Sequence, residues 1–378
     1  MARALRWAGV AAVVLAALLV LTTALPVRRW RTGQMPVPPL PLMPGGPEVD
    51  LPRRIWIDTD AACGHARTAD PDDCLAILLL ARTPDVELVG ISTVFGNAPL
   101  DVTDRTTREL AALLRGEGVD VPVYRGAARP LDPRAAPGDR GSSAPETPAQ
   151  TALGHALAEG PLTILSLGPL TNVELTLRRH AAGAAGVGRL VAVMGRRPGH
   201  IFHPTEGRGA GAVLFGHGPV FRDLNLAEDP SAAAALLARR LPMTLVPYEV
   251  AREVSVGAAD LDRMTAAGGA DAWVARRSRE WLEFWRKDVG LAGFYPFDAV
   301  AAAYVDAPEL FSCARVAASV ETDAALGWVG RLLGRATGLL VRPLAASAPP
   351  VGGRVVYCPQ VADSAVHHLM LQRLAPAS

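Results

Sequence analysis

At residues 55–60 the chain reads Ile55-Trp56-Ile57-Asp58-Thr59-Asp60, and a short loop leads from there to Asp70-Pro71-Asp72-Asp73 and an apolar run, Cys74 to Leu80. This order predicts a buried strand, an acidic loop and a helix. Carboxylates gathered at one strand end repel one another, and a hard cation such as Ca²⁺ or Mg²⁺, which takes oxygen ligands, commonly offsets that cost. The alternative is a solvated acidic turn that also caps the helix, since Asp suits both roles.

The same alternation of β-rich and helical segments continues along the chain. The predicted strands are Arg54–Asp58, Val86–Val94, Val121–Tyr124, Leu162–Leu167, Arg189–Met194 and Met243–Pro247. The predicted helices are Asp73–Ala81, Leu100–Leu114, Thr151–Ala158, Asn172–Arg179 and Ser231–Ala238. Near-continuous apolar strands that alternate with helices indicate an α/β fold, an open and mostly parallel sheet with helices on both faces. We expect Leu339–Pro343, Arg354–Pro359 and the helix Ser364–Leu374 to be additions at the end of the same sheet.

Polar residues recur where the predicted strands end. In open α/β sheets, ligands bind beyond the carboxyl ends of the strands. The residues placed there are Asp58 and Asp60, Asn97, Leu167 to Asn172, Met194, and, from a long loop, His217, Asp223 and Asn225. Each position alone is ordinary turn chemistry, but together they predict one site at this rim.

Length and composition are those of a globular protein with a large core. Half of the 378 residues are hydrophobic, and the formal net charge of +1 gives no reason to expect a nucleic-acid partner. We expect a single domain over residues 53–378, preceded by a Pro-rich linker at 31–52.

Residues 1–30 have the pattern of a signal anchor. Arginines flank an apolar run from about Ala8 to Val27, which approaches the ~20 residues that cross a bilayer. A cleaved signal peptide is the alternative, with Thr22-Thr23-Ala24 as the cleavage site. We therefore expect a membrane-anchored or exported protein with its globular part outside the cytoplasm.

The four cysteines fit an exported protein. Cys63 and Cys74 bracket the acidic loop, and a disulfide between them and free thiols are equally weighted hypotheses. For Cys313 and Cys358 we expect buried free thiols.

The order of the motifs resembles the inosine-uridine-preferring nucleoside hydrolases, metal-dependent N-ribosyl hydrolases with an open α/β sheet. The resemblance spans about residues 54–311. The matching segments are Asp58-Thr59-Asp60 with Asp72-Asp73, the run Gly90 to Asn97, Val121 to Gly126, Leu167 to Asn172, Asp223-Leu224-Asn225, Asp298, and Ala307 to Phe311.

This resemblance implies a calcium–ribose site. Ca²⁺ would be held by Asp60, Asp73, Asp298 and the main-chain carbonyl of Leu167, with Asp60 as the general base that deprotonates the attacking water. The residues that would bind the sugar are Asp72, Asn97, Met194, His217, Asp223 and Asn225. Asp58 would orient the loop.

Two departures from the family pattern concern the same site. The loop between Asp60 and Asp72 is longer than the family's turn, which leaves open whether Asp70 or Asp72 contacts the sugar. Phe297 stands where many members have a histidine that protonates the leaving base. Tyr295, His217, Trp281 and Trp285 are the alternative candidates to donate to or stack on a base, although helix packing is the favoured reading of the two tryptophans. For His200 and His203 we expect no chemical role.

The sequence thus predicts a calcium-dependent nucleoside N-ribohydrolase that takes a small ribonucleoside. The alternative is a member of the same fold that binds a ribosyl compound without efficient hydrolysis, because phenylalanine cannot donate a proton. Base preference and oligomeric state, including a homo-oligomer, stay open.

Overall fold

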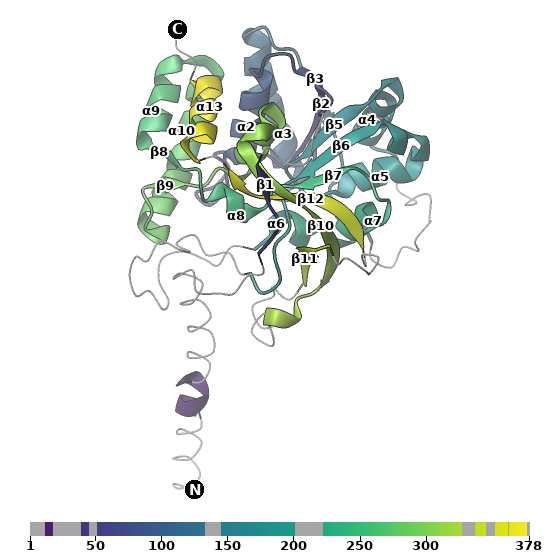
Figure 1. Cartoon of the computed structure of the whole chain (residues 1–378). Coiled ribbons are helices and arrows are strands. Elements are labelled where there is room, and N and C mark those ends of the chain that lie inside the picture. Colours follow the sequence, from purple (N-terminus) through teal and green to yellow (C-terminus); the bar gives the residue numbers. More distant parts are fainter. Residues whose placement is uncertain are drawn as a thin grey trace, which may run out of the picture.

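The protein is described from a computed structural model that covers residues 12–17, 39–44, 51–132, 145–200, 222–326, 337–344, 352–361 and 363–375. Its centre is a ten-stranded sheet in the order β1-β10-β12-β7-β6-β5-β2-β3-β4, with β11 paired to β10 (Figure 1). From β12 to β4 all neighbours are parallel, whereas β10 is antiparallel to β1, β11 and β12.

The strands of the main sheet are β1 (Met43–Pro44), β2 (Arg54–Thr59), β3 (Glu87–Thr93), β4 (Val123–Arg125), β5 (Leu162–Ser166), β6 (Val187–Ala192), β7 (Met243–Leu245), β10 (Phe311–Thr322), β11 (Thr337–Pro343) and β12 (Gly353–Val361). A separate two-stranded sheet pairs β8 (Val256–Gly257) with β9 (Gly293–Phe294).

Among the described residues beyond residue 50, the α-helices are α2 (Asp72–Ala81), α3 (Leu100–Gly116), α4 (Pro148–Glu159), α5 (Thr171–Arg179), α6 (Leu224–Glu228), α7 (Pro230–Ala238), α8 (Tyr248–Ala251), α9 (Ala258–Ala267), α10 (Gly269–Phe284), α11 (Phe297–Asp306) and α13 (Asp363–Leu374). A π-helical turn, η2 (Trp285–Val289), continues α10.

The two faces of the sheet have separate cores because successive strand residues point to opposite sides. In β2, Ile55 and Ile57 join the core under α2, α10, α11 and α13, whereas Trp56 joins the core under α4, α5 and α7. Figure 1 shows these two groups of helices on either side of the sheet. The predicted α/β class, with a mostly parallel sheet covered on both faces, is confirmed.

The predicted elements agree with the structure to within three residues at each end, but the structure adds elements after β7 that were not among them, including α9 and α10. The long strand β10 was not among the predicted strands, and it carries the antiparallel additions β1 and β11. Its sequence is rich in Ala and Ser rather than in large β-branched residues, so its signal is weak. Met43 and Pro44, which lie in the predicted linker, add a short strand to its edge.

Two disulfides join all four cysteines. The Cys63–Cys74 bond confirms one of the two hypotheses for that pair. The prediction of free thiols at Cys313 and Cys358 was wrong, because these residues are bonded between β10 and β12. They are 45 residues apart, and only the antiparallel pairing of these strands brings them together.

Of the predicted signal anchor, only residues 12–17 lie within the described part, as a helical segment. Among the described residues, none of the helices is both long and apolar enough to span a bilayer.

Candidate active site

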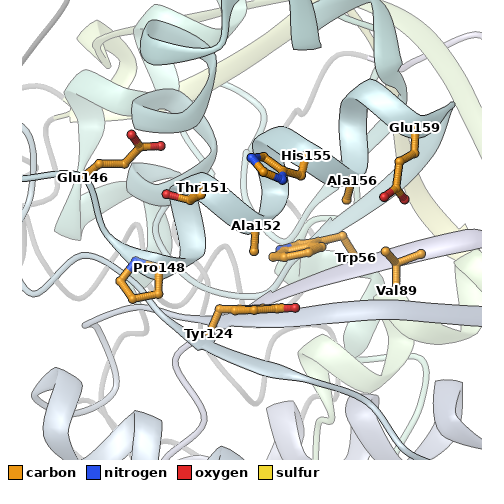
Figure 2. Close-up of a pocket in the computed structure, with 10 residues that line it drawn as sticks. All are labelled: Trp56, Val89, Tyr124, Glu146, Pro148, Thr151, Ala152, His155, Ala156 and Glu159. Atoms are coloured by element: carbon orange, nitrogen blue, oxygen red, sulfur yellow. The ribbon is translucent and has the colours of Figure 1, made fainter.

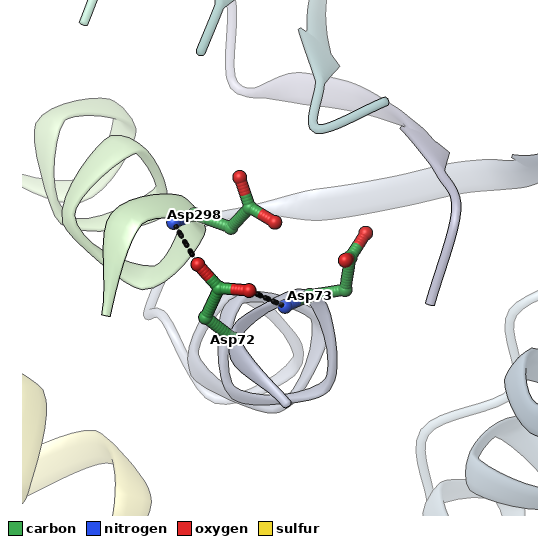
Figure 3. Close-up of side chains that lie close together, drawn as sticks. All are labelled: Asp72, Asp73 and Asp298. Carbon is green, nitrogen blue, oxygen red and sulfur yellow. Dashed lines mark hydrogen bonds between the residues drawn. The ribbon is translucent and has the colours of Figure 1, made fainter. Parts of the chain in front are cut away.

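Three buried carboxylates converge where two helices begin. Asp72 and Asp73 form the first turn of α2, and Asp298 lies in the first turn of α11, which packs against α2 (Figure 3). One oxygen from each carboxylate lies within 4.8 Å of the others. Asp72 accepts hydrogen bonds from the backbone N–H of Asp298 at 2.9 Å and from that of Asp73 at 3.1 Å. The positive ends of two helix dipoles therefore meet these acids.

Asp60 reaches the same cluster from the end of β2. Its backbone N–H donates to Asp73 Oδ1 at 3.2 Å. The Asn97 side chain donates from one nitrogen to Asp60 Oδ1 and to Asp73 Oδ2, both at 3.2 Å, and the Asn97 backbone N–H donates to Asp60 Oδ2 at 2.8 Å. The Thr59 hydroxyl also donates to Asp73. The predicted residues Asp60, Asp73, Asn97 and Asp298 thus form one connected group with Asp72.

Asp58, two residues before Asp60, has hydrogen-bond partners outside this group. Its Oδ1 accepts from Ser92 Oγ at 2.6 Å and from Asn172 Nδ2 at 2.7 Å. Asn172 also accepts from the backbone N–H of Ala127. Asp58 therefore ties β2 to β3 and to the first turn of α5, an arrangement compatible with the predicted orienting role.

The cluster carries negative charge that no basic side chain balances. Within the described ranges, no Arg, Lys or His forms an ion pair with Asp60, Asp72, Asp73 or Asp298. Burial, and then the charge of Asp72, raises the pKa of Asp73 to about 7. Burial and the charge of Asp73 raise the pKa of Asp60, and burial with Asp72 and Asp73 raises that of Asp298. An all-oxygen, uncompensated donor set of this kind fits a hard divalent cation.

The remaining predicted sugar-binding residues line the neighbouring strand ends. Asn225 Nδ2 donates to the carbonyls of Leu167 at 2.6 Å and of Val193 at 3.0 Å, so α6 is fastened to the ends of β5 and β6. Asp223 caps α6 through the backbone N–H of Leu226 and also accepts from the backbone N–H of Gly195 at 2.7 Å. Met194 is buried next to Gly195. His217 and His203 lie outside the described residues.

A model of the family described as inosine-uridine preferring nucleoside hydrolase matches residues 55–342. The chain belongs to this family. Uridine nucleosidase 1 of Arabidopsis thaliana is 28% identical over 292 residues, which cover 71% of this chain and 79% of that protein. A pyrimidine-specific ribonucleoside hydrolase of Salmonella typhimurium is 27% identical over 288 residues, which cover 71% and 84% of the two chains.

Solved structures show the same fold. A plant nucleoside hydrolase has a TM-score of 0.65 at 20% identity, covering 86% of this chain and all of that one. A purine-preferring ribonucleoside hydrolase from Gardnerella vaginalis has a TM-score of 0.63 at 17% identity, covering 85% of this chain and 98% of that one. The chain is an enzyme of the nucleoside hydrolase class, as its motifs predict.

Three of the residues predicted to donate a proton to the leaving base, or to stack on it, are buried in this hydrolase: Trp281, Trp285 and Tyr295. Trp285 and Tyr295 are buried edge to face with ring centroids 4.8 Å apart, and Trp281 is buried beside Phe284. Helix packing therefore accounts for both tryptophans. Phe297 is half-buried at the start of α11, directly before Asp298. In the inserted loop, Asp70 Oδ1 accepts a hydrogen bond from the backbone N–H of Asp72 at 3.3 Å, so both acids lie at the start of α2.

A buried ionic network at the same rim was not predicted. Glu249 of α8 accepts from Arg197 at 2.9 Å and from the Tyr357 hydroxyl of β12 at 2.7 Å, and His200 Nδ1 lies 3.2 Å from it. Burial alone would raise the pKa of Glu249, but the hydrogen bond and charge of His200, with Arg197 and Tyr357, lower it to about 2. His200 thus has a structural partner, which no local motif signals.

A hollow of about 710 Å³ lies between α4 and the strands β2 to β4 and contains none of the site acids (Figure 2). Trp56 and Tyr124 stack at its base with centroids 5.6 Å apart. Its two carboxylates are already paired, Glu146 with His180 and Glu159 with Arg54. We assign no ligand to this hollow.

Proposed function

We propose that this enzyme hydrolyses the N-glycosidic bond of ribonucleosides to ribose and free base with Ca²⁺ as its metal. The observation that carries the proposal is the group of buried carboxylates at the carboxyl rim of the sheet, which no basic residue of the described chain neutralises. Reaction at a ribosyl carbon builds positive charge on the sugar, and carboxylates fixed around it stabilise that charge as it develops.

Asp60, Asp73, Asp298 and the Leu167 carbonyl would hold the ion. The spacing of the acids supports this set, because one oxygen each of Asp73 and Asp298 lies, with one of Asp72, within 4.8 Å of the others, and the Asn97 amide joins Asp60 to Asp73. When bound, the cation lowers the pKa of a water molecule and takes sugar hydroxyls as ligands.

Asp60 would act as the general base and accept the proton of the attacking water. Asn97 holds both oxygens of this carboxylate by hydrogen bonds, which fixes its orientation for the transfer. The asparagines Asn97 and Asn225 donate their amide N–H groups to protein acceptors, so each keeps a carbonyl oxygen to accept a sugar hydroxyl. Asp72, Asp223, Met194 and His217 would complete the sugar pocket.

The second candidate function is binding of a ribosyl compound without efficient hydrolysis. Phe297 favours it, because a phenyl ring beside Asp298 cannot protonate a leaving base. If the protein does hydrolyse nucleosides without a proton donor at Phe297, those with good leaving groups should react faster than those whose base must be protonated.

We also propose that the domain works outside the cytoplasm. Both disulfides support this location, because such bonds persist in oxidising compartments and are rare in the cytosol.

Release of free base from inosine, uridine and cytidine, with calcium or with chelator, tests the activity. We expect release that the chelator abolishes and that Asp60→Asn lowers by about 10²–10⁴-fold. Asp120→Asn, at an exposed acid paired with Arg115, is the control and should keep the parent rate. If Asp60→Asn keeps the parent rate, Asp60 is not the base. If nucleosides raise the melting temperature without any release of base, the binding function holds instead.

A further inference from the structure

We propose that the Cys63–Cys74 disulfide is a positioning element for the cation site, which holds the acids of β2 and α2 together before the ion binds. The inference rests on the proposed calcium site and goes beyond it, because it assigns a role in metal affinity to residues that contact neither metal nor sugar.

The bond joins the two segments that deliver the acids. Cys63 follows Asp60 by three residues, and Cys74 follows Asp73 directly in the first turn of α2. Both cysteines are buried, with exposed fractions of 3% and 0%. A change in the separation of the two sulfur atoms therefore shifts the backbone next to Asp73 and alters its distance from Asp60.

Apart from the disulfide, the inserted loop, residues 61–71, is anchored by small side chains, among them Ala61 in the main core, and by one surface ion pair. Residues 64–68 are exposed. Arg67 pairs with Asp288 and lies 5.9 Å from the Phe284 ring, but both charged groups are about half exposed, and such surface pairs contribute little. Ala62 and Ala69 pack on Ala98, a small apolar contact.

In the first turn of α2, the acids themselves accept the free N–H groups: Asp70 accepts from Asp72, and Asp72 accepts from Asp73. Pro71 precedes this turn and offers no side-chain hydrogen bond to the free N–H groups of the helix. Besides the disulfide, this helix end is held by hydrogen bonds among the acids, by those that Thr59 and Asn97 donate to Asp73, and by the packing of α11 on α2.

Repulsion among the acids acts against this arrangement. Without a cation, ionised Asp60, Asp72 and Asp73 push the loop and the helix apart. The disulfide, which joins cysteines 11 residues apart, limits that separation. Ion binding then costs less conformational entropy, because the loop and the helix are already held close together. The link should therefore appear as a gain in metal affinity.

The test compares three full-length proteins: the parent, C63A/C74A, and C313A/C358A. The last removes the other buried disulfide, which joins β10 to β12, and is the matched control. Calcium dissociation constants are measured by isothermal titration calorimetry, together with kcat at low and saturating calcium. We expect C63A/C74A to bind calcium about ten- to a hundredfold more weakly, as for other residues that support metal ligands, and to regain kcat when calcium is saturating. The control should bind as the parent does.

Equal affinity in the parent and C63A/C74A would overturn the proposal, and so would equal weakening in both double variants. If C63A/C74A does not fold, Cys63→Ala alone opens the link while the Cys74 sulfur keeps its buried place, and the same weakening is expected. A parent that binds calcium but releases no base refutes the proposed hydrolysis and leaves the positioning role standing. A parent that binds no calcium refutes both.

Discussion

Gly96 lies against the general base proposed here. A Cβ atom at this position would stand 1.9 Å from Asp60 Oδ2 and 2.8 Å from its Cγ, and the backbone φ of +154° is one that side chains rarely adopt. The glycine therefore lets the loop after β3 close over Asp60, so that the backbone N–H of Asn97 reaches the carboxylate.

We expect Gly96→Ala to displace the Asp60 carboxylate without changing its charge. A misplacement of about 1 Å at a reacting group costs on the order of a hundredfold in rate, so kcat should fall by about that factor. Steady-state kinetics at saturating calcium measure it. Gly116→Ala at the end of α3, where a Cβ would meet nothing within 4 Å, is the control. Parent kinetics in Gly96→Ala would show that the carboxylate is not confined by this loop.

At the scale of elements, the Glu249 network connects the loop after β6 to α8 and β12. Arg197 and His200 come from that loop, and Tyr357 comes from a strand 108 residues away from Glu249. The same loop is held to β11 by the backbone N–H of Arg196, which donates to Leu339, and by the carbonyl of Arg196, which accepts from Val341. The C-terminal strands thus support the rim beside Met194.

Glu249→Gln should destabilise the protein by about 3 kcal/mol near neutral pH, because it leaves the half-buried Arg197 and the buried His200 without their counter-charge. The pKa of Glu249 is lowered from 4.5 to about 2 in the folded protein, so its stabilisation is present above about pH 4.5 and is lost as pH falls toward 2. Urea unfolding at several pH values measures the difference between parent and variant, which should shrink in acid.

Glu253→Gln, at an exposed acid paired with Arg252, is the control and should change stability little. A difference between parent and Glu249→Gln that stays constant down to about pH 3 would show that the charge of Glu249 is not what stabilises the network.

At the scale of the molecule, the acid cluster links stability to pH and to calcium. Burial raises the pKa of Asp58 to about 7, although Ser92 and Asn172 lower it, and burial with the charge of Asp72 raises the pKa of Asp73 to about 7. The ordinary pKa of an aspartate side chain is 3.8. A raised folded pKa means that the stabilisation is full below about pH 4 and is lost as pH rises through 7.

The calcium-free protein should therefore lose stability between about pH 5.5 and about pH 7.5, and calcium should raise the melting temperature more at the higher pH. At a hundredfold excess over its dissociation constant, calcium adds about 2.7 kcal/mol. Thermal melts with calcium and with chelator at both pH values measure this. In Asp73→Asn/Asp298→Asn the calcium response should vanish. A calcium shift of equal size at both pH values would contradict the linkage.

The sequence by itself determined what depends on local order along the chain. Apolar runs of strand length between helical segments specify a parallel sheet, and the turns after β2 and β3 put Asp60 and Asn97 at one rim. The family motifs follow the same order. The spacing of hydrophobic residues and the residue preferences of turns act over a few residues, so both can be recognised in the sequence without a structure.

Only the tertiary structure decided which of these side chains meet. Asp72 and Asp298 are 226 residues apart, and the packing of α11 on α2 brings them together. The Cys313–Cys358 bond, the partners of Glu249 and the burial of Trp285 behind Tyr295 depend likewise on elements that are distant in the chain. Contacts of this kind come from the sheet order and from the packing of helices on its faces, and no local pattern encodes them.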